Sequence, residues 1–462
     1  MVERLSKPLL YTYGVADLFF ALMINMEAYF FAAFLTDFAQ FSLALTGQIL
    51  AVTSLVDIAS ALIGGVVLQK TNLNYGGKYR SWFLIGPPLV APLFILQFTK
   101  IGSDWTAAFI LIFGCITSHL LFNVVVSASG AMAGRLSQLP DERTILSASR
   151  MQGMSVAGLI FSATAMPMIL FFAGHTNKVA GFTITVAIYS SLMILGYWYI
   201  YRITAGRDPY DEVVMSAAKK KSSQSVSEIV GLVFKNPPLL LLMLAQTFSS
   251  ASLFVITALA IYYFTYVVGK PAYLSVFLLA TSIGRILGSF GATWIGVRLG
   301  KRNTYWIFLS LAAAGYASGR LFTDTPWGFT LVFGASIMMA SIAASMSTAL
   351  FADTVVYGEW KTGKNIRAFT MALMNLPIKI GVLIRSAVVT AGLMAIGFVA
   401  NTTPTPRVVQ GITSIMTLIP ATTYAIAAII FFLGYKIEET HVTQMQQEIN
   451  ARKAPGETSI KA

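Results

Sequence analysis

The sequence predicts an all-α integral membrane protein with twelve transmembrane helices in two six-helix halves. Three observations predict this fold class: a high apolar content, a series of long apolar runs, and one long polar stretch that separates these runs six from six. Of the 462 residues, 56% are hydrophobic and only 11% are charged. A soluble chain of this length would need a far more charged surface. We therefore expect lipid, rather than water, to surround most of the molecule.

Each apolar run is long enough for one membrane crossing, because a helix needs about 20 mostly apolar residues to cross roughly 30 Å of hydrocarbon. Irregular backbone is excluded since unpaired backbone polar groups are costly in lipid. Runs longer than one crossing indicate tilted or kinked helices rather than extra spans. The predicted spans are residues 8–36, 44–69, 82–101, 104–134, 145–173, 179–203, 237–267, 272–299, 303–321, 328–352, 368–399 and 411–435.

The long polar stretch between the sixth and seventh spans predicts a linker. The expected parts of the chain are an N-terminal half (1–203), a linker (204–236), a C-terminal half (237–436) and a polar tail (437–462). Two six-span halves joined by a cytoplasmic loop match the architecture of major facilitator transporters, whose halves enclose a site near the bilayer midplane.

Lysine and arginine residues near the span ends predict the orientation. They gather on the side that holds both termini and the linker, and few lie on the other side. By the positive-inside rule, both termini face the cytoplasm, with the protein in the plasma (inner) membrane. The run Lys219–Lys221 also suits nucleic acid or anionic lipid. We interpret it as part of the topology signal, and expect membrane lipids but no nucleic acid as partners.

Signals for an enzyme are missing from the sequence. The single cysteine, Cys115, lies inside a predicted span, which excludes an intrachain disulfide framework, and we expect no metal site there. The three histidines are far apart in the sequence, and no P-loop, G-x-S-x-G or H-E-x-x-H motif is present. We therefore expect neither an enzyme nor a cofactor, apart from a coupling ion, H⁺ or Na⁺.

Two charged motifs fall at corresponding points of the two halves, and three more accompany them. These are "NYGGKYRSWFLIG" (74–86), "ADTVVYGEWKTGKN" (352–365), "YGVADLFF" (13–20), "FLTDF" (34–38) and "LAIYYFTYVVG" (259–269). With them, the chain from residue 10 to about 390 resembles the glycoside–pentoside–hexuronide:cation symporters, the family of the melibiose permease. The resemblance implies a secondary transporter that imports a glycoside or sugar acid by alternating access, and we expect it to function as a monomer.

The charges after spans 2 and 10 predict a cytoplasmic gate, because opposite charges at span ends can lock two halves by ion pairs that break in the other state. The alternative is solvated loop charge that only sets topology. Relatives commonly carry an Asp where Val356 stands, so one gate carboxylate is missing here. The predicted gate residues are Lys78, Arg80, Arg143, Asp353 and Glu359.

Polar residues inside spans are functional candidates by default, since they are costly in lipid. Ser54, Asp57 and Ser60 share one face of span 2, and the resemblance places Asp57 on the helix-2 carboxylate of the family's cation site. Sodium-using relatives have a second acid where this chain has Ala61. The resemblance therefore disfavours the familiar Na⁺ coupling, and a proton on Asp57 or Asp17, or uniport without any ion, stays open.

Polar residues in four further spans predict the substrate site. Asn123 stands where the melibiose permease carries an Asp, and Arg150 and Lys379 fall on basic positions of relatives. Lys379 would also pair with Asp57 across the halves. For Glu27, His119, Arg285 and Arg385, structural pairing within the bundle is the preferred interpretation, although His119 is kept among the substrate-binding candidates. The predicted substrate-binding residues are Asp17, His119, Asn123, Arg150, Asn375 and Lys379.

The basic interior favours an anionic substrate such as a hexuronide over a neutral glycoside. Transport of a lipid-like amphiphile is the alternative within transport. A membrane nutrient sensor that binds a sugar without moving it is the alternative of another class. Counterflow of labelled substrate in proteoliposomes separates a transporter from a sensor, because a sensor binds its ligand but does not exchange it.

Overall fold

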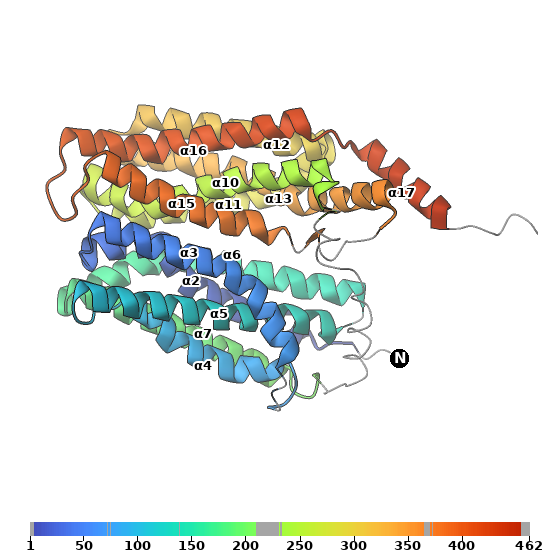
Figure 1. Ribbon diagram of the computed structural model, residues 1–462, viewed down its shortest axis with the longest axis horizontal. Helices are drawn as coiled ribbons and strands as arrows, with labels where there is room; N and C mark the ends of the chain where they lie inside the picture. The colour runs from blue at the N-terminus through green and yellow to red at the C-terminus, as the bar shows by residue number, and fades with distance from the viewer. Residues whose placement is uncertain are drawn as a thin grey trace, which may run out of the picture. The chain divides into compact units, whose positions relative to one another are not determined.

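The computed structural model describes residues 4–71, 73, 75–137, 139–208, 231, 233–364, 370–371 and 373–453, and every regular element in this part is a helix (Figure 1). Most of the predicted linker (204–236) and the end of the predicted tail lie outside the described residues.

The predicted N-terminal half contains six helical spans. Its first span is built from three consecutive pieces, a short helix, a long helix and a π-helical turn. In chain order the elements are α1 (Lys7–Thr12), α2 (Val15–Ala33), the turn η1 (Phe34–Phe38), α3 (Leu43–Lys70), α4 (Arg80–Leu96), α5 (Asp104–Leu136), α6 (Pro140–His175) and α7 (Lys178–Ile203).

The predicted C-terminal half repeats this plan, and its first span also ends in a π-helical turn. Its elements are α10 (Pro237–Tyr262), η2 (Tyr263–Val267), α11 (Tyr273–Leu299), α12 (Lys301–Ser318), the 3₁₀ turn η3 (Gly319–Phe322), α13 (Pro326–Thr362), α15 (Asn375–Ala395) and α16 (Pro406–Gly434). One further helix, α17 (Glu439–Lys453), lies in the predicted polar tail.

Ten of the described helices are long and apolar enough to cross a membrane. The shorter α4, which contains three prolines, and the less apolar α12 bring the number to the twelve predicted spans. The predicted all-α fold class is confirmed.

Helix α13 is longer than the predicted span 328–352. It continues through the Y-G-E-W-K-T motif to Thr362, so Asp353 and Glu359 lie on helix rather than in a loop. The helix ends at Gly363, whose φ of 69° suits glycine and whose N–H donates to the Glu359 carbonyl at 2.8 Å. The predicted span stopped at residue 352 because the residues after it are polar. Hydropathy locates the point where a helix leaves the lipid, and α13 continues as a helix beyond that point.

The described chain forms two compact units. Unit 1 is Met1–Met215 with Val255–Ser282 and Leu383–Met416, and unit 2 is Ser216–Phe254 with Ile283–Val382 and Thr417–Ala462. Unit 1 therefore combines the predicted N-terminal half with one end of α10, α11, α15 and α16. The division of the chain into halves at residues 203 and 237 stays a prediction.

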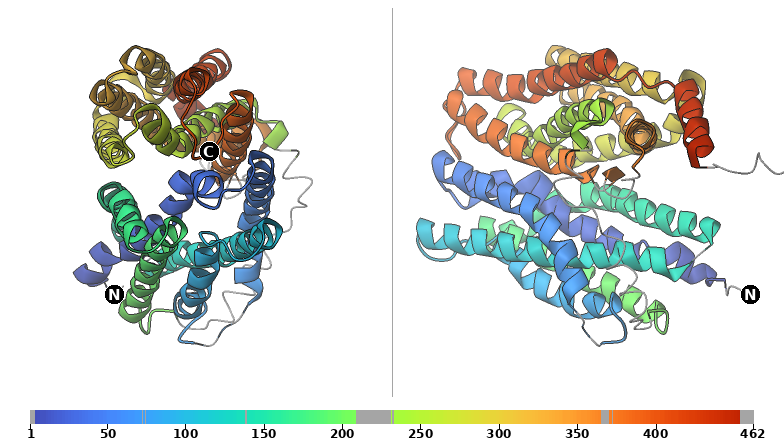
Figure 2. Two further views of the ribbon diagram at one scale, coloured as in Figure 1. Left: turned by 90° about the vertical axis from the view of Figure 1, so that its left-hand side faces the viewer. Right: turned by 45° about the vertical axis from the view of Figure 1, so that its right-hand side comes forward.

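Within unit 1, α5 packs against α3 and α4 (Figure 2), and α2 meets α6 through glycines. A Cβ added to Gly14 would lie 2.0 Å from the Ser149 carbonyl oxygen, and one on Gly153 would lie 2.2 Å from the Gly14 carbonyl oxygen. Small residues at such a crossing let two membrane helices approach backbone to backbone. The close approach brings Asp17 on α2 opposite Arg150 on α6.

The two π-helical turns, η1 and η2, lie together in unit 1. The Thr36 and Tyr262 hydroxyls are 2.8 Å apart, and the Tyr266 hydroxyl donates to Asp37 Oδ2 at 2.9 Å. Asn401 closes the group, because its N–H donates to the Tyr266 hydroxyl at 2.9 Å and its Nδ2 donates to the Asp37 carbonyl at 2.7 Å. The motifs "FLTDF" and "LAIYYFTYVVG" thus meet at one hydrogen-bonded cluster.

Candidate functional site

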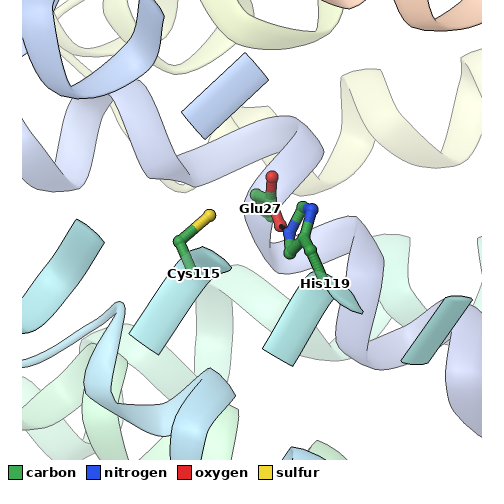
Figure 3. Close-up of side chains that lie close together, drawn as sticks. All are labelled: Glu27, Cys115 and His119. Atoms are coloured by element: carbon green, nitrogen blue, oxygen red, sulfur yellow. Dashed lines mark hydrogen bonds and ion pairs between the residues drawn. The ribbon is translucent and has the colours of Figure 1, made fainter. Parts of the chain in front are cut away.

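A histidine between two carboxylates lies in the interior of unit 1. His119 Nε2 is 2.7 Å from Glu27 Oε2, and His119 Nδ1 is 2.9 Å from Asp57 Oδ1. The three side chains come from α5, α2 and α3, and their exposed fractions are 5%, 14% and 12%. Figure 3 shows the His119 ring directed at the Glu27 carboxylate. We call these three residues the carboxylate–histidine triad.

Both contacts of the triad are hydrogen bonds only if it holds two protons. A neutral imidazole carries a single N–H, and an ionised carboxylate carries none. The second proton therefore sits on the other ring nitrogen or on one of the carboxyl groups. With both hydrogen bonds formed, the triad holds one proton more than a neutral histidine beside two ionised carboxylates would.

Arg385 of α15 supplies positive charge to the same region. Its side chain is buried, Nη1 lies 3.4 Å from the Ala28 carbonyl oxygen, and its charge acts on both Glu27 and Asp57. Two ionised carboxylates and one guanidinium sum to a single negative charge. One added proton makes this buried group of residues neutral.

Cys115 lies one turn before His119 on α5. The ligand atoms of Glu27, Cys115 and His119 all lie within 4.8 Å of one another, a grouping that the sequence did not indicate (Figure 3). Two atoms bound to one tetrahedral zinc ion at about 2.0–2.2 Å are roughly 3.3 Å apart. The 2.7 Å between Nε2 and Oε2 is shorter than that. The arrangement fits a shared proton better than a shared metal ion.

The other predicted polar residues of spans 2 and 4 form hydrogen bonds with one another, with backbone or with α15. Asn123 Nδ2 donates to the Ser60 hydroxyl at 3.1 Å and to the His119 carbonyl at 2.8 Å. The Ser60 hydroxyl donates to the Asp57 backbone carbonyl at 3.0 Å, and the Ser54 hydroxyl is 3.0 Å from that of Ser386. Both serine hydroxyls thus have hydrogen-bond partners other than the Asp57 carboxylate.

Asp17 and Arg150 form a second buried charged pair in unit 1. Arg150 Nε lies 2.9 Å from Asp17 Oδ2, and Nη2 lies 2.9 Å from Oδ1, which is a two-point fork. Asp17 is only 2% exposed. The sequence predicted each residue for the substrate site but did not predict that they pair.

Asn375 and Lys379 lie in the first two turns of α15, which belong to unit 2. Asn375 is exposed and Lys379 is partly buried. Their substrate role, and the pairing of Lys379 with Asp57, stay predictions.

The predicted gate residue Arg80 has several hydrogen bonds within unit 1. Its guanidinium donates to the Gly76 and Tyr201 carbonyls, each at 2.6 Å, and stacks on the Tyr201 ring at 4.3 Å. The backbone N–H groups of Tyr79 and Arg80 both donate to Asp208 Oδ2, at 2.6 and 3.0 Å. Arg80 therefore holds the turn before α4 to the end of α7.

Two more predicted gate residues have partners in their own unit. Arg143 Nε donates to the Ser137 carbonyl at 2.7 Å, and Asp353 pairs with Lys301 at 2.7 Å. Lys78 lies in the turn before α4 and Glu359 in the last turn of α13. Ion pairs of these residues between the halves stay a prediction.

Buried charges inside long apolar helices, arranged on this plan, define a membrane transporter of the major facilitator class rather than an enzyme. The chain belongs to the MFS/sugar transport protein family, whose model matches residues 12–439. The predicted family resemblance is confirmed.

Two relatives and one solved structure show how far this similarity extends. The chain is 26% identical to the glucuronide carrier protein homolog of Escherichia coli, over 98% of this chain and 97% of the relative. It is 22% identical to the isoprimeverose transporter of Lactiplantibacillus pentosus, over 95% and 91%. The crystal structure of a D-xylose–proton symporter matches 94% of this chain and 98% of its own, with a TM-score of 0.65 at 15% identity. The protein is thus a secondary transporter of sugar-like substrates.

Proposed function

We propose that the protein imports a sugar or sugar acid together with protons, and that the carboxylate–histidine triad is the proton site. The observation that carries the proposal is the His119 ring held at 2.7 and 2.9 Å between carboxylates of two other helices. The relative named as a glucuronide carrier supports a sugar acid as substrate. Both termini face the cytoplasm, and the transporter works as a monomer.

The proton acts through the charge of the buried group. Moving a net charge through a low-dielectric interior is costly. With Glu27, Asp57 and Arg385 charged, the group bears one negative charge, and a proton on the triad cancels it. Proton binding therefore favours the change between outward-open and inward-open states, and substrate binding completes it.

Sodium is the less suitable ion for this group of residues. A Na⁺ site needs several hard oxygen ligands around one point. The predicted ligands Ser54 and Ser60 hydrogen-bond to Ser386 and to backbone, and the Asp57 carboxylate contacts a ring nitrogen. A proton requires only the contacts already present.

Transport in proteoliposomes tests the proposal. The purified protein is given labelled methyl β-D-glucuronide or methyl β-D-glucoside, with an inward gradient of either H⁺ or Na⁺. We expect at least one of these sugars to accumulate with the H⁺ gradient and without Na⁺. Accumulation that requires Na⁺ at every pH contradicts proton coupling. Counterflow without accumulation under any gradient would instead identify a uniporter.

A further inference from the structure

Unit 2 contains a cavity of its own, apart from the triad. Its volume is about 180 Å³, and α10, α11, α12, α13 and α16 line it. A single buried water needs only about 10–15 Å³ on this measure, so the cavity has room for a substantial chemical group. Its polar lining includes Gln246, Ser249, Arg285, Tyr305, Ser347 and Tyr424.

Arg285 is the one charged side chain among the described residues that line this cavity. Its charge acts on Tyr316 and Tyr424, whose hydroxyls are neutral groups. A guanidinium among membrane helices is costly unless water or an anion compensates its charge. The cavity therefore offers a cation and lacks a described acid to neutralise it.

The backbone of α11 around Arg285 packs closely against α13. A Cβ on Gly284 would lie 2.4 Å from the Gly334 carbonyl oxygen, and one on Gly288 would lie 2.4 Å from that of Met338. Helix α11 thus touches the backbone of α13 on both sides of Arg285. The Ser341 hydroxyl also donates to the Arg285 carbonyl at 2.8 Å.

The remaining polar groups suit a hydroxylated molecule. The Gln246 Oε1 is buried and accepts no hydrogen bond within the described part of the chain. The Tyr305 side chain is 1% exposed and its hydroxyl lies beside Ser249 and Ser347. An acceptor and several hydroxyls near one guanidinium match the groups of a sugar acid, since hydroxyls donate to the amide oxygen and a carboxylate accepts from arginine.

We propose that this cavity receives the carboxylate end of a sugar acid, with Arg285 as the two-point partner of the carboxylate and Gln246 as an acceptor for a sugar hydroxyl. Arginine presents a planar fork that matches a carboxylate, which lysine does not. The inference rests on the proposed function, because it names the substrate class of the transporter. It also assigns Arg285 a role in choosing between acidic and neutral sugars.

The test compares two sugars that differ only at C6, methyl β-D-glucuronide and methyl β-D-glucoside. Exchange of each is measured in proteoliposomes for the wild type, Arg285→Gln and Arg285→Lys. Arg298→Gln is the matched control, because Arg298 lies on the same helix, stacks on Trp294 at 3.8 Å and does not line the cavity. We expect Arg285→Gln to raise the KM for the glucuronide at least tenfold and to leave that for the glucoside unchanged.

Arg285→Lys should recover only part of the affinity, and Arg298→Gln should behave as wild type. An equal loss for both sugars in Arg285→Gln, or no loss for either, overturns the assignment of Arg285. A wild-type protein that carries the glucoside and not the glucuronide also overturns it, while leaving the proposed sugar transport intact.

A binding measurement keeps the inference testable if no sugar in the assay is transported, an outcome that counts against the proposed function alone. Sodium glucuronate should raise the Tm of the detergent-solubilised wild type and of Arg298→Gln, but not that of Arg285→Gln. Sodium chloride at equal ionic strength is the control. An equal glucuronate shift in all three proteins overturns the anion site.

Discussion

The triad and the Asp17–Arg150 pair of unit 1 consist of ionisable groups that contact one another, whereas Arg285 of unit 2 faces a cavity lined by neutral groups. Arg150 has a carboxylate 2.9 Å away, and His119 has two within 2.9 Å. Arg285 has the hydroxyls of tyrosines within electrostatic reach. A cluster that already balances its charge responds to the gain or loss of a proton. A cation in a neutral cavity responds to an anion that arrives with the substrate.

The largest effect is expected from removing one carboxylate of the triad. Asp57→Asn removes one negative charge permanently, so Glu27 and Arg385 balance each other without an added proton and the change of state no longer depends on proton binding. Accumulation against a gradient should fall at least tenfold, while downhill counterflow continues. Glu27→Gln should behave in the same way. Ser54→Ala, which alters the same face of α3, is the control and should keep most of the accumulation.

Proteoliposome uptake and counterflow, measured on the same preparation, check this prediction. Concentrative uptake that survives in Asp57→Asn and Glu27→Gln would transfer the coupling role to another acid, with Asp17 the first candidate. The triad of unit 1 would then not be the proton site, and its contrast with Arg285 of unit 2 would not explain coupling.

A smaller effect, on folding rather than on coupling, is expected from the second pair of unit 1. Removing one partner of a buried ion pair typically costs about 3–5 kcal/mol, so Asp17→Asn should lower the Tm in detergent clearly. The double variant Asp17→Leu/Arg150→Leu, which removes both charges, should recover part of that loss. A Tm equal to wild type in Asp17→Asn would show that Arg150 is well hydrated in solution and is not held by this pair.

The cytoplasmic gate provides a third test, with an effect of a few-fold. If Glu359 helps to lock the halves, Glu359→Gln should bias the protein towards the inward-open state and lower exchange about threefold without loss of folded yield. Arg80→Gln should differ, because Arg80 has its partners within unit 1, and it should lower the Tm. Labelling of cysteines placed near the site from the cytoplasmic side measures the bias. Unchanged labelling in Glu359→Gln would argue against the gate.

The smallest effect is expected from replacing Cys115, because its thiol takes part in neither of the two short hydrogen bonds of the triad. Cys115→Ala should leave the pH dependence of uptake unchanged within about twofold. A loss of coupling in this variant, or a stimulation of wild-type uptake by added zinc, would point to metal binding instead of proton binding.

The same cysteine-free background serves to test the orientation. Single cysteines at Ser222 and Thr403 should react with impermeant reagents from opposite sides of the membrane. Reaction from one side only would contradict the twelve-span topology on which the direction of import depends.

Lipid explains why the spans could be predicted from the sequence and the sites only in part. Each span must be apolar whatever surrounds it, so the apolar runs alone located α3 or α16. The triad required three helices to meet, and no periodicity relates Glu27 to His119, 92 residues away. The sequence predicted Asp57 and His119 as candidate site residues. It did not predict Glu27, the third residue of the triad, because a structural ion pair or hydrogen bond was the preferred interpretation for that side chain. For Arg285, the sequence indicated a charge inside a span but did not indicate a cavity around it.

The cluster of η1 and η2 also has a consequence for how the chain matures. Asn401 hydrogen-bonds to the Asp37 carbonyl from 364 residues further along the chain. Ribosomes add about 5–20 residues per second, so the end of the first span waits on the order of tens of seconds for Asn401, which is synthesised after its other partners Tyr262 and Tyr266. During that interval it depends on insertion machinery, lipid or α7 for protection. Truncated chains that stop before residue 401 should therefore be recognised by membrane proteases more readily than chains that end just after it.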